Sequence, residues 1–382
     1  MALITYLTRI QFDFGALKLL DAELQLLGIR RPLIVTDKGV IGAGLWAKVK
    51  DQLPGNMPIT LYDGTPENPT EAAMRDALKI YKDEGCDGII AIGGGSPMDL
   101  AKAVGLMATH PGNSLQAYSF VEGGASKITS KVAPIVAIPT TSGTGSEVSR
   151  GGVIIMDSGR KLAIGSPHLI PRLALIDPEL TLSLPPHLTA GTGMDAFTHN
   201  IECYLSNVFN PPADSIALDG LEKAWTYVER ATRDGQDREA RYNMAVAAME
   251  GAMVFQKGLG AVHALSHPTG GLKGYRTHHG TLNAVYLPAV LRFNAPAVGD
   301  KYARVAQVMG LPQRERNAEG VANAVAELNA RLGIPKGLSG MGLKQEVVEA
   351  IADGALGDHC HLTTPRQPTK AEYVQLIQES WG

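Results

Sequence analysis

An acid and a histidine stand four residues apart in the stretch GMDAFTHN, where Asp195 and His199 sit in a helical pattern. Residues i and i+4 project from one face of a helix, so a carboxylate and an imidazole at this spacing can bind one metal ion together. A buried Asp–His hydrogen bond has the same spacing. The pair alone therefore leaves two interpretations, a structural pair and half of a metal site.

Four further histidines lie close together in GAVHALSHPTGGLKGYRTHHGTLNAVYLP: His263, His267, His278 and His279. The first two repeat the i, i+4 spacing on a second predicted helix. Carboxylate and imidazole together suit Fe²⁺, Zn²⁺, Co²⁺ or Ni²⁺ better than Mg²⁺ or Ca²⁺, which prefer oxygen ligands. Two such helices favour a metal site, but the spacing does not say which of the four histidines are ligands.

A phosphate-binding turn is indicated by IIAIGGGSPMDLAKA at 89–103, a buried strand followed by three glycines and a helix. Glycine lets the backbone approach a ligand closely, and the helix start offers N–H groups and the positive end of its dipole. We expect Ser96 to cap this helix and Pro97 to open it. The motif is neither G-x-G-x-x-G nor a Walker A loop.

Two other segments have residues suited to a nucleotide. IPTTSGTGSEVS at 138–149 is a strand that runs into a hydroxyl-rich turn, and Asp37 ends the strand in LIVTDKG. An acid there can bind ribose hydroxyls and would repel a 2′-phosphate, which favours NAD over NADP. All three segments follow predicted strands, and open α/β sheets bind ligands at the carboxyl ends of their strands.

The elements that carry these residues change character along the chain. In the first half, apolar β-branched runs predict strands at 31–36, 87–93, 133–139, 152–156 and 173–177, with helices at 68–85 and 96–110 between them. This alternation predicts a mainly parallel sheet with crossover helices. The second half reads as all-helical: 187–207, 213–232, 237–257, 282–297, 300–309, 316–332, 343–353 and 369–380. We therefore expect an α/β domain at 1–184 and an all-helical domain at 185–382.

Composition excludes several classes of protein. The 382 residues are 45% hydrophobic and 19% charged, with 35 basic and 38 acidic side chains, which is typical of a globular protein without a nucleic-acid or membrane partner. No apolar run approaches the ~18 residues that span a bilayer, and the N-terminus lacks the pattern of a signal peptide. The three cysteines form no CxxC pair. A cytoplasmic protein is expected.

These motifs together resemble the iron-containing (group III) alcohol dehydrogenases. The resemblance rests on GGGSPMDLAKA, PTTSGTGSEVS, KLAIGSPHLIPRLALIDPELTLSLP, GMDAFTHNIECYLS and the histidine-rich stretch, and it covers essentially the whole chain. It implies a dinucleotide-binding domain, a helical metal-binding domain and an active site in the cleft between them, an architecture shared with dehydroquinate synthase. It also implies reversible oxidation of a small alcohol with NAD(P) and Fe²⁺ or Zn²⁺, in a homodimer or larger homo-oligomer.

Carried over by position, the resemblance implies that the metal ligands are Asp195, His199, His263 and His279. His267 would line the nicotinamide and relay the proton, since imidazole titrates near neutrality. The implied cofactor residues are Asp37, Asn68, Gly94, Gly95, Ser96, Asp99, Thr140, Thr141, Thr144, Ser146, Lys161 and Leu180.

The implied substrate positions are Arg150, Gly151, Phe255, Lys257, Cys360 and Arg366. Just after GSEV, relatives often carry Thr or small apolar residues, whereas SEVSRGG here places Arg150 beside a pair of glycines. A guanidinium can bind a carboxylate bidentately. A small hydroxy acid or semialdehyde is therefore one hypothesis for the substrate; Arg150 in solvent or in an ion pair is the other. The alternative functions are a dehydroquinate synthase-like activity, a glycerol or polyol-phosphate dehydrogenase, and a non-catalytic binding protein.

Overall fold

The computed structural model describes residues 8–382. The described residues form two compact units. The N-terminal unit contains the chain up to Thr141 together with Gly145–Ser183, and the C-terminal unit contains Ser142–Thr144 and Leu184–Gly382.

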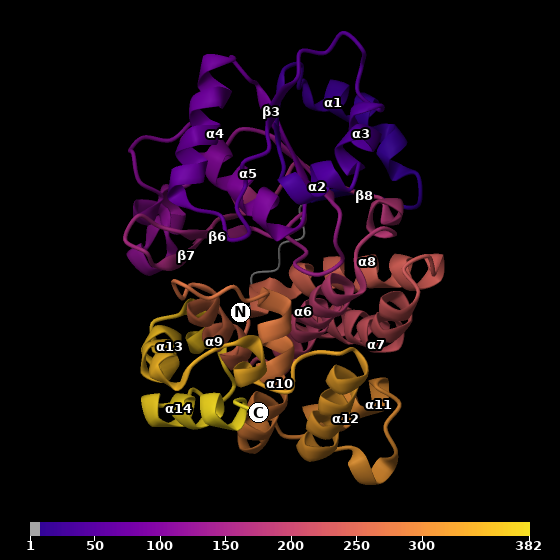
Figure 1. The fold of residues 1–382 in the computed structure, drawn as a ribbon, viewed down its shortest axis with the longest axis vertical. Helices are drawn as coiled ribbons and strands as arrows, with labels where there is room; N and C mark the ends of the chain where they lie inside the picture. Colours follow the sequence, from indigo (N-terminus) through magenta and orange to yellow (C-terminus); the bar gives the residue numbers. More distant parts are fainter. Residues whose placement is uncertain (1–7) are drawn as a thin grey trace. The chain divides into compact units, whose positions relative to one another are not determined.

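A six-stranded sheet forms the centre of the N-terminal unit (Figure 1). Its strand order is β1-β8-β5-β4-β2-β3, and every pairing is parallel. The strands are β1 (Arg9–Phe12), β2 (Pro32–Val35), β3 (Thr60–Tyr62), β4 (Gly88–Gly93), β5 (Ile135–Pro139) and β8 (Leu173–Ile176). The predicted parallel sheet is confirmed.

Both faces of this sheet are covered. On one face, Ile89 and Ala91 of β4 pack in a core that includes α4 (Glu71–Asp83) and α5 (Gly95–Met107). On the other face, Ile90 and Ile92 pack in a core with α1 (Leu20–Leu27), α2 (Lys38–Gly42) and α3 (Leu45–Lys50). Successive strand residues point to opposite faces, which explains why the central strands are apolar throughout. Figure 1 shows α4 and α5 on one side and α1 and α3 on the other.

The predicted strand at 152–156 belongs to a separate hairpin. β6 (Gly151–Ile155) pairs antiparallel with β7 (Lys161–Gly165), and neither joins the six-stranded sheet. The alternating burial of both strands fits a sheet that is covered on one face only.

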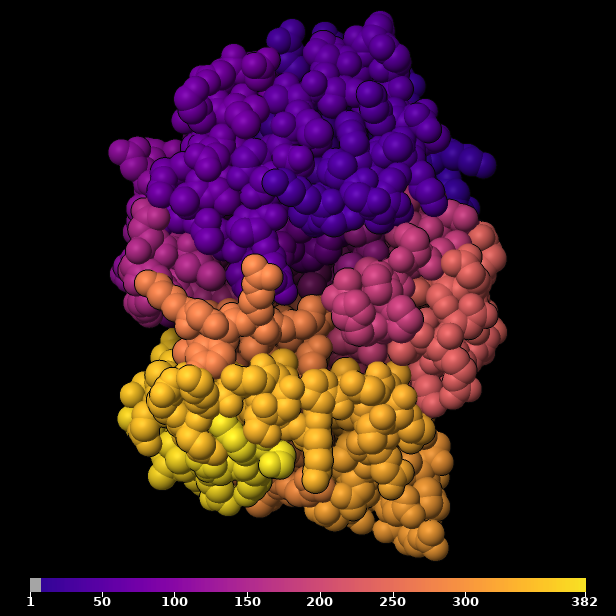
Figure 2. Space-filling view, in the orientation of Figure 1, coloured from indigo at the N-terminus to yellow at the C-terminus, as the bar shows by residue number. Residues whose placement is uncertain are grey.

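The C-terminal unit is helical, as expected, and it has one large hydrophobic core. Its α-helices are α6 (Pro186–Leu205), α7 (Pro211–Arg233), α8 (Arg238–Met253), α9 (Ala261–Gly270), α10 (His279–Val298), α11 (Lys301–Val308), α12 (Ala318–Arg331), α13 (Val348–Leu356) and α14 (Lys370–Glu379). Helix α6 is buried from Thr189 to Leu205 and packs against α7, α8 and α10. The chain ends at the surface of this unit, in yellow in Figure 2.

Among the described residues, no helix combines the length and the apolar character that a bilayer crossing needs.

Candidate active site

Three helices of the C-terminal unit bring an acid and three imidazoles together. Asp195 and His199 lie on α6, His263 lies on α9, and His279 is the first residue of α10. Asp195 Oδ1 is 3.4 Å from His199 Nε2, 3.7 Å from His263 Nε2 and 3.7 Å from His279 Nε2. Asp195, His199 and His263 are at most 4% exposed. We call these four residues the histidine cage.

The spacing of the cage suits a divalent cation. Metal–ligand bonds of about 2.1 Å in a tetrahedron put neighbouring ligand atoms about 3.4 Å apart. The 3.4 and 3.7 Å separations around Asp195 Oδ1 match that value. One carboxylate with imidazoles is also a donor set for Fe²⁺ or Zn²⁺. The ligand atoms of Asp195, His263 and His279 all lie within 4.8 Å of one another, so these three residues fit such an ion, and His199 Nε2 adds a fourth donor 3.4 Å from Asp195 Oδ1.

His278 has a different place from His279. Its Nδ1 accepts from the Thr281 backbone N–H, so His278 is the N-cap of α10 and His279 begins the helix. Of this adjacent pair, it is His279 whose Nε2 faces Asp195.

Two residues that the sequence analysis missed hold the cage. His263 Nδ1 donates to Glu202 Oε2 at 2.6 Å, and Glu202 Oε1 accepts from the Val262 N–H at 2.8 Å. Because Nδ1 is engaged with Glu202, Nε2 is the ring nitrogen of His263 that faces Asp195. Asn283 Nδ2 donates to Asp195 Oδ1 at 2.7 Å and lies 3.1 Å from His263 Nε2 and 3.2 Å from His279 Nε2.

Burial and charge act in opposite directions in the cage. Burial would raise the pKa of Asp195, but His199 and the other imidazoles outweigh it and hold that pKa well below the usual range. Burial lowers the pKa of His199 to about 4. Burial also disfavours charge on His263, but hydrogen bonds to Asp195 and Glu202 raise its pKa to about 9. An ionised Asp195 and a neutral His199 are the forms that bind a cation.

His267 lies beside the cage on α9. Its ring is 5.5 Å from the ring of His279 and nearly parallel to it. Its Nδ1 donates to Asp358 Oδ2 at 2.9 Å, a contact that the sequence analysis did not foresee. The implied substrate residue Phe255 packs its ring edge-on against His199 at 4.7 Å. Cys360 is 1% exposed, two residues from Asp358.

The glycine turn of the N-terminal unit is built as expected, with one correction. Gly93 has a φ of +145°, and a Cβ there would lie 2.7 Å from Pro97 Cγ. The N-cap of α5 is Gly94, so the prediction that Ser96 caps the helix and Pro97 opens it is wrong. Helix α5 already begins at Gly95, and Ser96 Oγ donates to the Glu67 carbonyl instead.

Other implied cofactor residues gather near this turn. The Thr140 N–H donates to the Gly93 carbonyl at 2.9 Å, and Thr141 Oγ1 lies 3.3 Å from where a Gly94 Cβ would stand. Asp37 follows β2 and caps α2 by accepting from the Val40 N–H at 2.9 Å.

The remaining implied cofactor residues lie in three places. Lys161 Nζ donates to Asn68 Oδ1 at 2.9 Å, so these two are brought together. Leu180 is buried in a hydrophobic core of the N-terminal unit. Thr144 belongs to the C-terminal unit.

Asp99 and Ser146 are tied into a buried network around Lys102. Lys102 Nζ donates to the Ser146 carbonyl and hydroxyl, the Ser149 hydroxyl and the Gly151 carbonyl at 2.6–3.0 Å. Ser146 Oγ donates to Asp99 Oδ1 at 2.7 Å. Burial lowers the pKa of Lys102 to about 8 and raises that of the nearby Glu147 to about 7. The network fastens the hydroxyl-rich turn to α5.

The positively charged side chains at the implied substrate positions differ in their surroundings. Arg150 is exposed and has no carboxylate partner among residues 8–382, and Gly151 begins β6. Lys257 is buried in an ion pair with Asp214. Arg366 pairs with Glu372 and lies over the Phe293 ring. Of the three cations, Arg150 is the one free to meet an anion.

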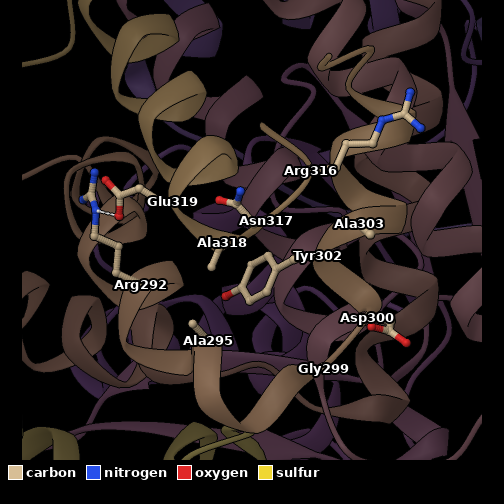
Figure 3. A pocket seen from close by; sticks show the side chains of 10 residues that line it. All are labelled: Arg292, Ala295, Gly299, Asp300, Tyr302, Ala303, Arg316, Asn317, Ala318 and Glu319. Atoms are coloured by element: carbon tan, nitrogen blue, oxygen red, sulfur yellow. Dashed lines mark hydrogen bonds and ion pairs between the residues drawn. The ribbon is translucent and has the colours of Figure 1, made fainter. Parts of the chain in front are cut away.

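A cavity of about 500 Å³ opens elsewhere in the C-terminal unit (Figure 3). Four of its polar side chains are engaged in structural contacts: Arg292 pairs with Glu319, Asn317 caps α12, and Tyr302 donates to the Leu291 carbonyl. It includes none of the predicted site residues. Its lining is Arg292, Ala295, Gly299, Asp300, Tyr302, Ala303, Arg316, Asn317, Ala318 and Glu319.

A parallel sheet with a glycine-rich turn, together with a helical unit that holds a histidine cage, defines a dehydrogenase-like class of protein. Comparison with known proteins names the family. Residues 8–178 match the model of iron-containing alcohol dehydrogenases, and residues 189–381 match that of the C-terminal part of the same family. The chain belongs to the iron-containing alcohol dehydrogenase family, so the resemblance is confirmed. It is an oxidoreductase that transfers hydride between a small alcohol and its aldehyde or ketone.

Similar proteins align over their full length. The chain is 54% identical over 387 residues to the 4-hydroxybutyrate dehydrogenase of Cupriavidus necator, with 100% of both covered. The crystal structure of a 1,3-propanediol oxidoreductase has a TM-score of 0.93 at 35% identity and covers 99% of this chain and 100% of its own. Sulfoacetaldehyde reductase from Bifidobacterium kashiwanohense, solved with NAD⁺, has a TM-score of 0.86 at 26% identity, with coverages of 99% and 98%.

Proposed function

We propose that this enzyme interconverts a small ω-hydroxy acid and its semialdehyde, with NAD as the hydride carrier and a divalent metal in the histidine cage. The observation that carries the proposal is the convergence of three imidazoles on one carboxylate oxygen of Asp195. The proposed ligands are Asp195, His199, His263 and His279. When bound, the cation supplies Lewis acidity to the alcohol oxygen and the nicotinamide accepts the hydride.

Protein side chains would accept the proton that the alcohol loses. Asp358 Oδ2 accepts a hydrogen bond from Nδ1–H of His267 at 2.9 Å. In the neutral ring, Nε2 of His267 is then the atom that would accept the alcohol proton. Glu202 and Asn283 hold the ligand side chains in place through their hydrogen bonds. Phe255 covers the edge of His199 and limits the access of water to that ligand.

For the cofactor, Asp37 supports NAD over NADP. A carboxylate at the end of β2 can accept from ribose hydroxyls, and it would repel a 2′-phosphate. A relative of known structure binds NAD⁺. We propose contacts with the cofactor from the glycine turn and its neighbours: Asp37, Asn68, Gly94, Gly95, Ser96, Asp99, Thr140, Thr141, Thr144, Ser146, Lys161 and Leu180.

The metal is proposed to be Fe²⁺, because the family takes its name from iron and the donor set accepts it. Zn²⁺ fits the same donors, and elemental analysis after anaerobic purification distinguishes the two. The three cysteines are all free, which supports a reducing compartment such as the cytoplasm. Homo-oligomerisation stays a prediction that light scattering would test.

For the substrate, two observations support an acid. A relative with 54% identity is a 4-hydroxybutyrate dehydrogenase, and Arg150 has no carboxylate partner among the described residues. A guanidinium without a partner can bind a carboxylate bidentately. We propose that Arg150 contacts the carboxylate of the substrate, and that Gly151, Phe255 and Cys360 also line the substrate pocket.

Comparing succinic semialdehyde with butyraldehyde tests this substrate class. We expect the kcat/KM for succinic semialdehyde to exceed that for butyraldehyde by roughly tenfold or more. Arg150→Gln should lower the kcat/KM for succinic semialdehyde by about 10–100-fold, or ~1.4–2.7 kcal/mol. Butyraldehyde turnover should change little in this variant. Arg160→Gln is the matched control, because Arg160 is also exposed and lies next to the same hairpin. Equal kcat/KM for the two aldehydes in the unmodified enzyme would refute the acidic substrate.

A further inference from the structure

A second group of metal-binding side chains lies beside the histidine cage and shares no ligand with it. His267, Asp358, His359 and Cys360 each offer a ligand atom, and these atoms lie within 4.8 Å of one another. His267 Nδ1 is 2.9 Å from Asp358 Oδ2, and His359 Nε2 is 3.5 Å from Cys360 Sγ. We call these four residues the thiol cluster.

The local fold holds the thiol cluster together. Asp358, His359 and Cys360 are consecutive, at the start of the 3₁₀ helix His359–Thr363, and the Cys360 N–H donates to Asp358 Oδ1 at 2.8 Å. The His267 and His359 rings stack 5.7 Å apart at an interplanar angle of 15°. The four donors are therefore grouped before any ion binds.

The donor set and its exposure suit a soft or borderline ion that enters from outside. One thiolate, two imidazoles and one carboxylate are the ligands that Zn²⁺ takes, at about 2.3 Å for sulfur and about 2.0–2.1 Å for nitrogen. Cys360 is 1% exposed, so a thiolate there would be shielded from water. The side chain of His359 is 35% exposed, which gives an ion a path into the cluster.

We propose that the thiol cluster is a second, inhibitory zinc site. Binding would form bonds from Zn²⁺ to Cys360 Sγ, to His267 Nδ1, to His359 and to Asp358. The thiol proton of Cys360 and the Nδ1 proton of His267 would leave to solvent, and no electron transfer is involved. Zn²⁺ would replace the proton that His267 shares with Asp358. The inhibition, but not the binding, rests on the proposed role of His267 in proton relay.

The cage should fill first and the thiol cluster second. The rings of His263 and His267 are 5.7 Å apart, so two divalent charges in the neighbouring sites repel each other. The second equivalent is therefore expected to bind more weakly than the first. The proposed ligands of the cage include no sulfur, so a sulfur signature identifies the second site.

Titration of the metal-free, full-length protein with Co²⁺ under anaerobic conditions tests the binding. We expect two equivalents to bind, with the second producing the near-ultraviolet charge-transfer band of a cobalt–thiolate bond. Cys360→Ser should bind one equivalent and show no such band. Cys86→Ser, which removes a buried thiol of the N-terminal unit, should behave like the unmodified protein. No band at saturation, or a band that persists in Cys360→Ser, would overturn the site.

A second variant keeps the test informative if Cys360→Ser does not fold. His359→Leu changes a half-exposed side chain. Loss of a residue that only hydrogen-bonds a metal ligand weakens metal binding by roughly 10–100-fold, so loss of the ligand His359 should weaken binding of the second equivalent by at least that much. In assays of the loaded enzyme, Zn²⁺ should inhibit the unmodified protein at concentrations about tenfold or more below those needed for His359→Leu. Formation of the band without inhibition would overturn only the inhibitory role. Because the band is recorded without substrate, it tests metal binding independently of the proposed function.

Discussion

At the scale of single residues, carboxylate partners set the orientation of two imidazoles, His263 in the cage and His267 beside it. Glu202 fixes His263 and Asp358 fixes His267, in both cases through Nδ1. In a neutral ring, a carboxylate that holds the proton on Nδ1 leaves Nε2 as the atom that can bind a cation or accept a proton. The two histidines lie four residues apart on α9, and their different carboxylate partners give them different surroundings.

Asp358→Asn should slow turnover without removing the metal. The amide is a weaker acceptor than the carboxylate and leaves the ring of His267 less well held, so we expect kcat to fall by roughly 10–100-fold. KM and the metal content of the histidine cage should stay close to those of the unmodified enzyme, and the solvent isotope effect on kcat should rise. Steady-state kinetics in H₂O and D₂O with elemental analysis measure this. Asp353→Asn, at an exposed position of α13, is the control. Loss of the cage metal in Asp358→Asn would contradict a role through His267.

Residue spacing predicted part of this site. The i, i+4 pairs pointed to Asp195, His199 and His263, and Glu202 is three residues beyond His199, on the same face of α6. That spacing was a signal for Glu202 that the sequence analysis did not use. Asp358 had no such signal, because it lies 91 residues from His267 and meets it only through the tertiary fold. Asn283 had no such signal either, because its side chain meets Asp195 only when α10 packs on α6.

At the scale of elements, the cage depends on how closely α10 approaches α6. Gly280 lies at the start of α10, and a Cβ there would be 2.1 Å from the Gly191 carbonyl and 3.0 Å from Asp195 Cβ. Only glycine allows this approach. The contact sets the separation between His279 and Asp195.

Gly280→Ala should therefore push α10 away from α6. We expect a loss of ~1–3 kcal/mol in the free energy of unfolding from overpacking, and weaker metal binding because His279 moves. Denaturant unfolding of the metal-free protein and a metal competition assay measure the two effects. Gly357→Ala is the control, since the nearest atoms to its Cβ would be at an ordinary 3.7 Å. Equal metal affinity in Gly280→Ala and the unmodified protein would contradict this account.

Helices α7 and α8 share a carboxyl pair that makes stability depend on pH. Burial, then the hydrogen bond and charge of Asp219, raises the pKa of Glu250 to about 8. The folded chain therefore holds a proton on Glu250 that the unfolded chain releases near its ordinary pKa of 4.5. The free energy of unfolding should fall as pH rises from about 4.5 to about 8.

Glu250→Gln should remove this part of the pH dependence, because a neutral amide has no proton to lose. Urea midpoints at pH 6 and pH 8.5 measure it, with Glu346→Gln at an exposed position as the control. The same decline with pH in Glu250→Gln as in the unmodified protein would show that other groups cause it.

Elements differ in how far the sequence predicted them. The apolar strands β2, β4, β5 and β8 are recognisable because burial on both faces demands apolar residues throughout. β1 (RIQF) and β3 (TLY) are short edge strands, and their mixture of polar and apolar residues gives no continuous apolar run that would mark a strand. Ser96 was expected to be a cap from its residue type, but the φ of Gly93 lets the chain turn earlier, so that Gly94 takes that place.

At the scale of the whole molecule, the chain combines two kinds of architecture. The N-terminal unit is a parallel sheet whose strand ends carry the glycine turn and Asp37. The C-terminal unit is a helical bundle whose buried helix α6 carries two of the four proposed metal ligands. The sheet and the helical half followed from hydrophobic periodicity. The substrate could not be predicted in the same way, because the side chains proposed to select it, such as Arg150, follow no periodicity.

The measurement that most directly tests the account is metal-dependent NADH formation in paired proteins. The unmodified enzyme and Asp195→Ala are loaded anaerobically with Fe²⁺, desalted, analysed for bound metal, and assayed with NAD⁺ and 4-hydroxybutyrate at 340 nm. We predict that the unmodified enzyme retains metal and forms NADH, and that chelation abolishes this activity. Asp195→Ala should have lost both metal and activity while remaining folded by circular dichroism. Full activity in Asp195→Ala, or undiminished turnover after chelation, would contradict the account.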